Sequence, residues 1–211
     1  MSVFFAILLG FSPSIRFGGS PIVRNTMMSL IVPGSSQILY GSKIKGYAFV
    51  ATEILGILGK FYYDHLADVT RDKYKIFAYI EAGADPQNGD ESYWYAIERR
   101  KSKDDFIEYL WRQARSLYPT DPAKQQEYVN SHLVSGSWSF PTLDSWFAYR
   151  KMRRDERAYS DDASVMVGVI IANHIFSALD AFISTKLASK KVSLKTHMGL
   201  YNSSVFLNFR F

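Results

Sequence analysis

The sequence predicts a mainly α-helical, membrane-associated protein. It would consist of a helical hairpin, a third apolar helix, a water-facing helical insertion between them, and a short β segment at the C-terminus. Of the 211 residues, 47% are hydrophobic and 16% are aromatic. The mean hydropathy is nevertheless only −0.10, because apolar runs towards both ends of the chain flank a polar middle. A chain of this length can form one large domain with a sizeable core.

Composition and charge exclude several classes of protein. The chain has no cysteine, which excludes disulfides, thiolate metal sites and cysteine nucleophiles. Its hydrophobic content excludes an intrinsically disordered chain. The formal net charge is +5 and the isoelectric point is about 9.2. A charge this mild suits an anionic membrane surface as well as it suits nucleic acid.

Residues 1–24 form an apolar N-terminal segment, which contains the run VFFAILLGF at 3–11. The run resembles the hydrophobic region of a secretory signal, but no Lys or Arg precedes it and no small-residue cleavage site follows it. We expect it to be retained, as an uncleaved signal-like segment or an anchor, although it is too short to span a bilayer as a helix. Gly18, Gly19 and Pro21 separate it from a single helical domain over residues 25–187.

The first part of that domain is the hairpin, over residues 27–63. Pro33-Gly34 interrupts the apolar segment 27–40, which predicts a short helix, a break and a second helical turn. A tight basic loop (GSKIKG) then leads into an apolar helix over residues 47–63. The residues expected to define the hairpin break are Pro33, Gly34, Gln37, Gly41 and Gly46.

The third apolar helix is predicted over residues 163–183, after a strongly charged basic helix over residues 145–159. A helix over residues 163–179 is about 25 Å long, slightly less than the roughly 30 Å of hydrocarbon in a bilayer. Basic residues lie on both sides of it, so no orientation is predicted. We favour membrane association over a soluble helical core. The cations expected to face lipid headgroups or a partner are Arg150, Lys151, Arg153, Arg154 and Arg157.

Residues 64–146 are the predicted water-facing insertion, and they are rich in aromatic side chains. The helix expected at 104–118 has the clearest pattern, since Phe106, Leu110, Gln113 and Leu117 share one face. Further helices are predicted at 71–82, 91–101 and 123–132. We expect the aromatic residues of this insertion to contact partners.

The C-terminal tail, residues 188–211, ends in a strand-like pattern. Val205, Leu207 and Phe209 alternate with Phe206, Asn208 and Arg210, which is the period of a β-strand. An edge strand that docks on a partner or on this chain is one interpretation, and the last strand of an outer-membrane barrel is the other. We favour the edge strand, because a barrel needs at least about eight strands.

Motifs for catalysis, cofactors and metals do not occur in the sequence. The four histidines are not spaced as metal ligands, and there is no glycine-rich phosphate loop or nucleophile elbow. Paired acids such as Asp104-Asp105 point in different directions on a helix, so we expect them to be solvated or to cap helices. We therefore expect no enzymatic activity, no cofactor and no metal.

Polar residues inside the apolar segments are the candidate functional residues. Glu53, Asn173, His174 and Asp180 lie where an unpaired polar group is costly. Ser177 falls on the same helix face as Asn173 and Asp180. A proton path, an ion path and a buried ligand are the functional interpretations. We favour a structural polar cluster that joins the hairpin to the third helix, for example through Glu53 and either His174 or an arginine of the basic helix.

Two sets of motifs carry a family resemblance. The chain reads SLIVPGSSQILYG at 29–41, with Lys45-Gly46 and Glu53 after it, and NHIFSALDA at 173–181. These resemble the S-x-x-x-P-G-x-G-Q-x-Y-x-G…K-G hairpin and the N-H-x-x-S-A-x-D-A helix of a bacterial cell-envelope family of unknown function. The resemblance covers most of residues 25–187. Ser36 departs from it, where the family usually has Gly, and Leu39 adds one residue. The resemblance implies an envelope location and no assigned activity.

The leading functional hypothesis is a non-catalytic, membrane-associated structural or accessory subunit of a bacterial cell-envelope complex. Its partners would be the lipid bilayer and other protein subunits, and we expect no nucleic acid. The sequence does not distinguish the inner from the outer membrane. The alternative is a lipid- or small-molecule-binding envelope module, in which the aromatic middle and the polar cluster would form a pocket.

Overall fold

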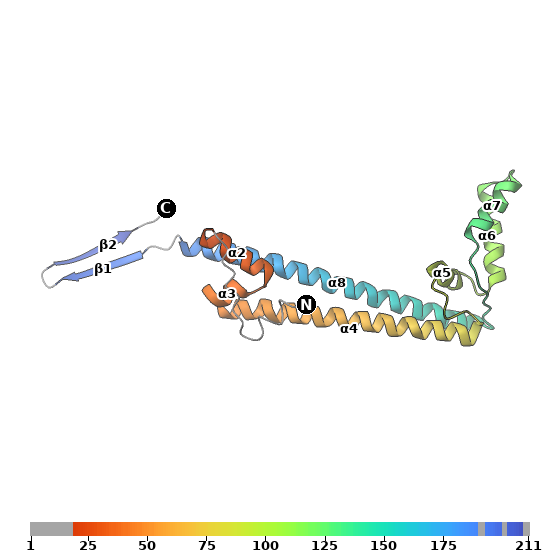
Figure 1. Cartoon of the computed structure of the whole chain (residues 1–211), viewed down its shortest axis with the longest axis horizontal. Coiled ribbons are helices and arrows are strands. Elements are labelled where there is room, and N and C mark those ends of the chain that lie inside the picture. Colours follow the sequence, from red (N-terminus) through yellow and green to blue (C-terminus); the bar gives the residue numbers. More distant parts are fainter. Residues whose placement is uncertain (1–18, 190–192, 200–201, 209–211) are drawn as a thin grey trace. The chain divides into compact units, whose positions relative to one another are not determined.

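The computed structural model describes residues 19–189, 193–199 and 202–208, and most of the apolar N-terminal segment predicted at 1–24 lies outside these ranges. The described part is mainly helical, which confirms the predicted class (Figure 1). The helices, in chain order, are α2 (Pro21–Ile31), α3 (Ser35–Tyr40), α4 (Lys43–Ala82), α5 (Glu91–Arg99), α6 (Lys103–Leu117), α7 (Pro122–His132) and α8 (Leu143–Ser189).

Short polar side chains cap the N-termini of the shorter helices. Ser102 caps α6 by accepting from the backbone N–H of Asp105 at 3.2 Å, and Asp121 caps α7 by accepting from that of Lys124 at 3.0 Å. Each cap satisfies an N–H group that has no partner within its own helix. Proline occupies the first position of α2 and α7, where a missing N–H costs nothing.

Helices α4 and α8 are longer than the sequence predicts. The sequence predicts that one helix ends at residue 63 and another starts at 71, whereas α4 continues through both points. The predicted basic helix at 145–159 and the apolar helix at 163–183 are likewise parts of the single helix α8. No Pro or Gly follows Gly59 in α4, and none precedes Gly168 in α8. A change from apolar to charged residues does not end a helix, because the backbone hydrogen bonds are unaffected.

Helix α8 is also the one helix among the described residues that is long and apolar enough to cross a membrane. The helix formed by residues 163–183 would be about 31 Å long, which matches the roughly 30 Å of a hydrocarbon core. The start of α4 is apolar too, but Glu53 and Lys60 lower its hydropathy.

The chain forms two compact units, whereas the sequence predicts one domain over residues 25–187. Unit 1 comprises residues 1–57 and 167–211, and unit 2 comprises residues 58–166. Both long helices contribute residues to both units. The division arises because the middle of the chain has a hydrophobic core of its own.

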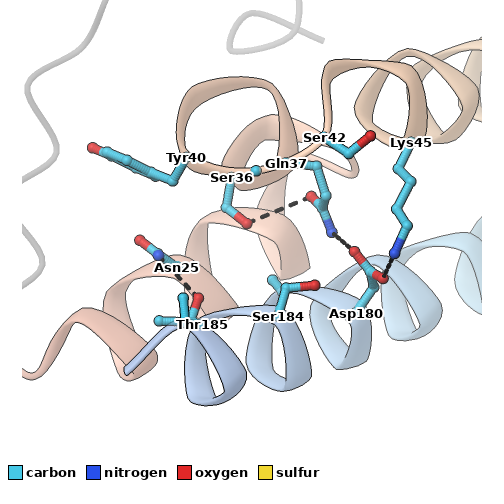
Figure 2. Close-up of a pocket in the computed structure, with 12 residues that line it drawn as sticks. Asn25, Ser36, Gln37, Tyr40, Ser42, Lys45, Asp180, Ser184 and Thr185 are labelled. Carbon is cyan, nitrogen blue, oxygen red and sulfur yellow. Dashed lines mark hydrogen bonds and ion pairs between the residues drawn. The ribbon is translucent and has the colours of Figure 1, made fainter. Parts of the chain in front are cut away.

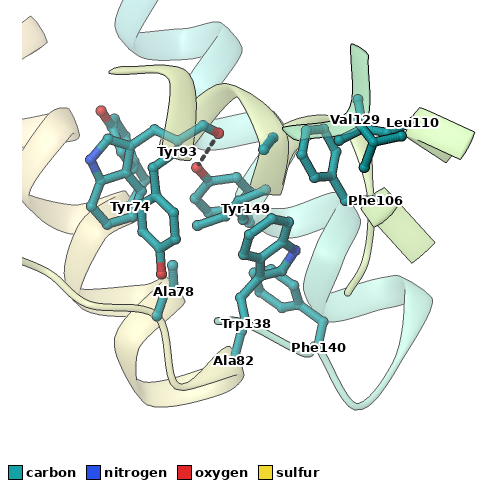
Figure 3. Packing of buried hydrophobic residues seen from close by; sticks show 14 of the residues in the cluster. Tyr74, Ala78, Ala82, Tyr93, Phe106, Leu110, Val129, Trp138, Phe140 and Tyr149 are labelled. Carbon is teal, nitrogen blue, oxygen red and sulfur yellow. Dashed lines mark hydrogen bonds between the residues drawn. The ribbon is translucent and has the colours of Figure 1, made fainter. Parts of the chain in front are cut away.

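Unit 2 is built around aromatic rings (Figure 3). Tyr74 makes edge-on contacts with Trp94 and with Tyr149, with ring centroids 5.7 Å apart in each pair. Trp94 is 1% exposed, and its indole N–H donates to the carbonyl of Asn88 at 2.9 Å. The Tyr149 hydroxyl donates to the carbonyl of Trp94 at 3.1 Å. These contacts account for many of the aromatic residues in the predicted insertion, since buried rings are stable when their polar atoms are bonded.

The predicted apolar stripe of the helix at 104–118 is partly wrong. Phe106, Leu110 and Ala114 are the buried residues of α6, whereas Leu117 is exposed. Residues four apart lie almost above one another on a helix, so the buried face follows that spacing through Ala114. The predicted stripe did not include Ala114, a small residue that is part of the buried face.

Near the C-terminus, strands β1 (Ser193–Gly199) and β2 (Asn202–Asn208) pair in antiparallel fashion. Ser193 lies opposite Asn208, and Gly199 lies opposite Asn202.

Candidate functional site

The break between α2 and α3 is held by backbone contacts that only glycine permits. Gly34 has a φ of +86°, and a Cβ atom there would lie 2.3 Å from the carbonyl oxygen of Gly46. A Cβ atom on Gly46 would lie 2.5 Å from Cγ1 of Ile38. The Gly34 N–H donates to the Ser177 hydroxyl at 2.8 Å. This bond satisfies a buried donor at a point where the helix is interrupted.

A chain of buried hydrogen bonds starts at this break and reaches α8. The Ser29 hydroxyl lies 2.8 Å from the Ser36 hydroxyl and 2.8 Å from Oε1 of Gln37. The Gln37 amide nitrogen donates to the carbonyl of Ser177 at 2.8 Å and to Oδ2 of Asp180 at 3.2 Å. Gln37 therefore uses both ends of its amide to connect α2 and α3 to α8 (Figure 2).

Asp180 ends this chain with an ion pair. Its Oδ1 lies 2.8 Å from the Lys45 ammonium, which is more exposed than the carboxylate. Gly41, which follows α3, donates its N–H to the carbonyl of Gln37 at 3.0 Å. The predicted hairpin-break residues Pro33, Gly34, Gln37, Gly41 and Gly46 thus lie around one network, and Pro33, Gly34, Gln37 and Gly46 are buried.

A second group of bonds lies around Glu53, which is 3% exposed. The Asn173 amide nitrogen donates to Oε2 of Glu53 at 2.9 Å and to the carbonyl of Phe49 at 3.0 Å. His174 has Nδ1 at 2.6 Å from the carbonyl of Leu30 and Nε2 at 3.1 Å from Oε1 of Glu53.

The partners of His174 fix where protons must lie. A carbonyl only accepts, so Nδ1 of His174 carries a hydrogen and donates it to Leu30. The bond between Nε2 and Oε1 of Glu53 then needs a second proton, either on the imidazole or on the carboxyl group. The bond between His174 and Glu53 thus joins α8 to α4.

The structure divides the predicted polar cluster into two groups. Glu53, Asn173 and His174 contact one another, whereas Ser177 and Asp180 bond to Gly34 and Gln37, with Lys45 as a further partner of Asp180. The sequence analysis did not assign Ser29, Ser36 and Lys45 to the cluster. All three lie within or beside the SLIVPGSSQILYG motif, and that motif was the available signal.

The predicted basic flank belongs to unit 2, and its members differ in their surroundings. Arg153 is buried and donates to the Tyr74 hydroxyl at 2.9 Å and to Glu91 at 2.5 Å. Arg157 donates to both carboxylate oxygens of Glu98, at 2.8 and 2.6 Å. The three other cations are Arg150, which lies 4.9 Å from the Trp146 ring, and Lys151 and Arg154, which are exposed.

These ion pairs shift the pKa values of groups in unit 2. Burial alone would raise the pKa of Glu98, but the guanidinium groups of Arg157 and Arg153 outweigh it and hold that pKa below its usual value. Burial raises the pKa of Tyr149 above its ordinary range. Burial alone would lower the pKa of Arg153. Its bond to Glu91 and the neighbouring groups outweigh burial, so the pKa lies above its usual value.

The surface of unit 1 is unusually apolar. Phe176 is 63% exposed, while its neighbour Ser177 is completely buried. Among the described residues of unit 1, Ala178 and Ala181 are buried hydrophobic residues, and the other buried side chains include Asn25, Ser29, Ser36, Gln37, Glu53 and Asn173. The exposed apolar residues of α8 include Val169, Ile171, Ile175, Phe176, Leu179 and Ile183. Those of α2, α3 and α4 include Leu30, Ile31, Leu39, Ile44, Ile54 and Leu55.

An open hollow of about 410 Å³ lies in unit 1, beside the Lys45–Asp180 pair. We call it the polar hollow. Figure 2 shows side chains from α2, α3 and α8 around it. Its polar lining consists of Asn25, Ser36, Gln37, Tyr40, Ser42, Lys45, Asp180, Ser184 and Thr185. The hollow contains Asp180 of the predicted polar cluster but no residue of the aromatic middle, whereas the predicted pocket combined the two.

Within the described ranges, no three His, Asp or Glu side chains come together in a way that could hold a metal ion. No family model, no curated protein and no solved structure matches this chain.

Proposed function

We propose that this chain is a non-catalytic, membrane-associated structural or accessory subunit of a protein complex in the bacterial cell envelope. The observation that carries the proposal is the inverted arrangement of unit 1, where polar side chains are buried and large apolar side chains are exposed. The family resemblance of residues 29–41 and 173–181 supports the envelope location.

The inverted arrangement fits a lipid environment on energetic grounds. Exposed apolar surface costs about 25 cal/mol per Å² in water, and that cost disappears in hydrocarbon. Soluble proteins rarely expose large contiguous apolar patches. In a bilayer, by contrast, helices associate through small and polar residues, as Ser177, Ala178 and Ala181 of α8 do in unit 1.

The helix break in unit 1 also fits a bilayer. Irregular backbone is tolerated at membrane depth only where protein buries it and satisfies its polar groups. The Val32–Gly34 break meets this condition, because Pro33 is buried and the Gly34 N–H is bonded to Ser177. Helices α2 and α3, of 11 and 6 residues, are too short to span a bilayer and would pack as a re-entrant pair.

A structural role is supported by how the polar residues are used. Gln37, Asn173 and Ser177 bond to other parts of the chain. Their bonds connect α2, α3 and α4 to α8, so the cluster holds the helices together. A transport path would need a continuous row of polar side chains across the unit, whereas these side chains are used in bonds between helices.

The location can be tested by vesicle flotation and by a high-salt wash of membranes that contain the full chain. We expect the protein to float with vesicles and to stay with the membrane pellet. Mild detergent should then release it together with other envelope proteins in fixed proportions. A soluble monomer after the salt wash would contradict the proposal.

The role of the polar cluster can be tested with Asp180→Leu, which removes the partner of Lys45 and one acceptor of Gln37. We expect this variant to lose most of its co-purifying partners, because the helices of unit 1 are no longer held together. Asp161→Leu, at an exposed position in unit 2, is the matched control and should assemble as the wild type does. Equal assembly of both variants would contradict the role of the cluster.

A further inference from the structure

We propose that the polar hollow binds the phosphate headgroup of an anionic phospholipid. The inference rests on the membrane location proposed above and adds a specific ligand class to unit 1. It follows from three features of the hollow: its hydrogen-bond donors, the charge around it and the apolar surface beside it.

The lining of the hollow is rich in donors. The Lys45 ammonium has three N–H groups, and Asp180 accepts one of them. Ser42, Ser184 and Tyr40 add hydroxyl groups. Phosphate oxygens are strong acceptors, and bonds between them and a charged donor are about twice as strong as neutral ones.

Cations lie in and beside the hollow, where Lys45 is part of the lining. The Arg24 guanidinium lies 4.9 Å from the ring of Tyr40, which is part of the lining. The one acidic lining residue, Asp180, has an oxygen bonded to Lys45 and an oxygen bonded to Gln37. A bound anion would therefore face Lys45, with Arg24 near the Tyr40 side of the lining, and a carboxylate whose oxygens are already bonded.

The surroundings of the hollow favour a lipid over free phosphate. Leu39, Phe182 and Leu187 are exposed, and each is next to a lining residue in the sequence. Acyl chains could lie along this apolar surface while the headgroup enters the hollow. A volume of about 410 Å³ is within the roughly 300–1,000 Å³ typical of ligand sites, and it is ample for a glycerophosphate group.

The test is lipid binding to the full chain in an uncharged detergent, measured by native mass spectrometry after removal of endogenous lipid. Phosphatidylglycerol and phosphatidylcholine are added separately. We expect the wild type to bind phosphatidylglycerol roughly tenfold more tightly, as one charge-assisted contact would give. Lys45→Gln should remove most of this preference. Ser184→Phe should also weaken binding, because it fills the hollow without breaking the Lys45–Asp180 pair. Lys124→Gln, on the exposed face of α7, is the control and should bind as the wild type does.

The binding and flotation results distinguish a lipid headgroup site, a free-phosphate site and the absence of both. Equal binding of both lipids, or unchanged binding by Lys45→Gln and Ser184→Phe, would overturn the headgroup site. If the protein then still floated with vesicles, the proposed function would survive. Displacement of phosphatidylglycerol by an equal concentration of inorganic phosphate would assign the hollow to free phosphate and overturn the lipid. Failure to float would remove both proposals.

Discussion

The two units of this chain sort their side chains in opposite ways. Unit 2 buries Trp94, Tyr74 and Tyr149 and, apart from Arg153 and Glu156, keeps its charged residues exposed or half-buried, as soluble domains do. Unit 1 buries serine, asparagine, glutamine and glutamate and exposes leucine, isoleucine and phenylalanine. Large apolar side chains are also exposed in unit 2, among them Leu58, Phe61, Ile76, Ile80, Leu133, Leu143 and Val165. Among the residues whose burial is described, the two units therefore differ in which kinds of side chain they bury.

We propose that the two units are suited to different solvents, unit 1 to lipid and unit 2 to water. In water, the burial of aromatic rings lowers the free energy of unit 2. In lipid, exposed apolar side chains carry no such cost, but polar groups must be hydrogen-bonded within the protein. The units also treat charge differently. Unit 2 places Arg153 between two carboxylates. Unit 1 relies mainly on uncharged hydrogen bonds, together with the Lys45–Asp180 ion pair and the bond between His174 and Glu53.

The largest expected effect of a single substitution is in the aromatic core of unit 2. We expect Trp94→Ala to destabilise the chain by about 3–5 kcal/mol, since it leaves a cavity among buried rings. Tyr95→Ala, at a position that is 48% exposed, is the matched control and should change the free energy of unfolding by less than about 0.5 kcal/mol. All four tryptophans lie in unit 2, so denaturant unfolding followed by tryptophan fluorescence reports on this unit. Similar effects of the two variants would refute an aromatic core.

The next test concerns the buried charge of unit 2. We expect Arg153→Met to cost about 1.5–3 kcal/mol, because it removes a charged donor from the Tyr74 hydroxyl and one of the two cations beside Glu98. Arg154→Met, at the exposed neighbouring position, should be within about 0.5 kcal/mol of the wild type. The same fluorescence measurement applies. If Arg154→Met lowered the free energy of unfolding more than Arg153→Met, the buried position of Arg153 would be contradicted.

A smaller effect is expected inside unit 1. Ser177→Val removes the acceptor of the Gly34 N–H and should cost about 1–3 kcal/mol, the penalty for a buried donor without a partner. Phe176→Ala, one residue earlier, removes a large apolar side chain that faces outwards, and we expect almost no effect in micelles. Thermal unfolding in detergent, followed by backbone circular dichroism, gives both values. In a unit with a water-soluble type of core, the order of the two effects would be reversed.

The smallest expected effect is a pH dependence. The pKa of Glu98 is lower in the folded chain than in the unfolded one, so its contribution to stability is present above the unfolded pKa of about 4.3 and disappears as the pH falls through the folded value. We expect Glu98→Gln to lower the unfolding midpoint at pH 7 and to flatten its decline below about pH 4.3. Glu127→Gln, at an exposed position, should leave both unchanged. An identical pH profile for Glu98→Gln and the wild type would contradict the ion pairs with Arg153 and Arg157.

Much of the architecture could be predicted from local signals. Pro33-Gly34 marks a helix break, and the structure has the break at these residues. The start of α6 follows from Ser102 and the acidic residues after it. The contact between Glu53 and His174 was one of two named possibilities, and the structure contains it. These features depend on neighbouring residues or on the cost of a polar group in an apolar segment.

Other features depend on contacts that a sequence does not reveal. Arg153 and Arg154 are adjacent and chemically identical, yet only Arg153 is buried. Whether a tyrosine of unit 2 is internal or exposed also depends on helices distant in the sequence, as for Tyr74 and Tyr149. The continuity of α4 and α8 was missed because composition changes along both helices while the backbone does not break. The polar hollow is formed by side chains from α2, α3, the start of α4 and α8, and it has no local signature.

The central claim is that unit 1 faces lipid and unit 2 faces water. The chain has no native cysteine, so single nitroxide labels can be placed with Leu55→Cys and Phe176→Cys in unit 1, and with Tyr95→Cys and Leu133→Cys in unit 2. All four positions are exposed. In lipid vesicles, electron paramagnetic resonance compares collisions of each label with oxygen, which partitions into lipid, and with a water-soluble nickel complex. We predict high oxygen and low nickel accessibility at positions 55 and 176, and the reverse at 95 and 133. Equal nickel accessibility at all four positions would contradict the account.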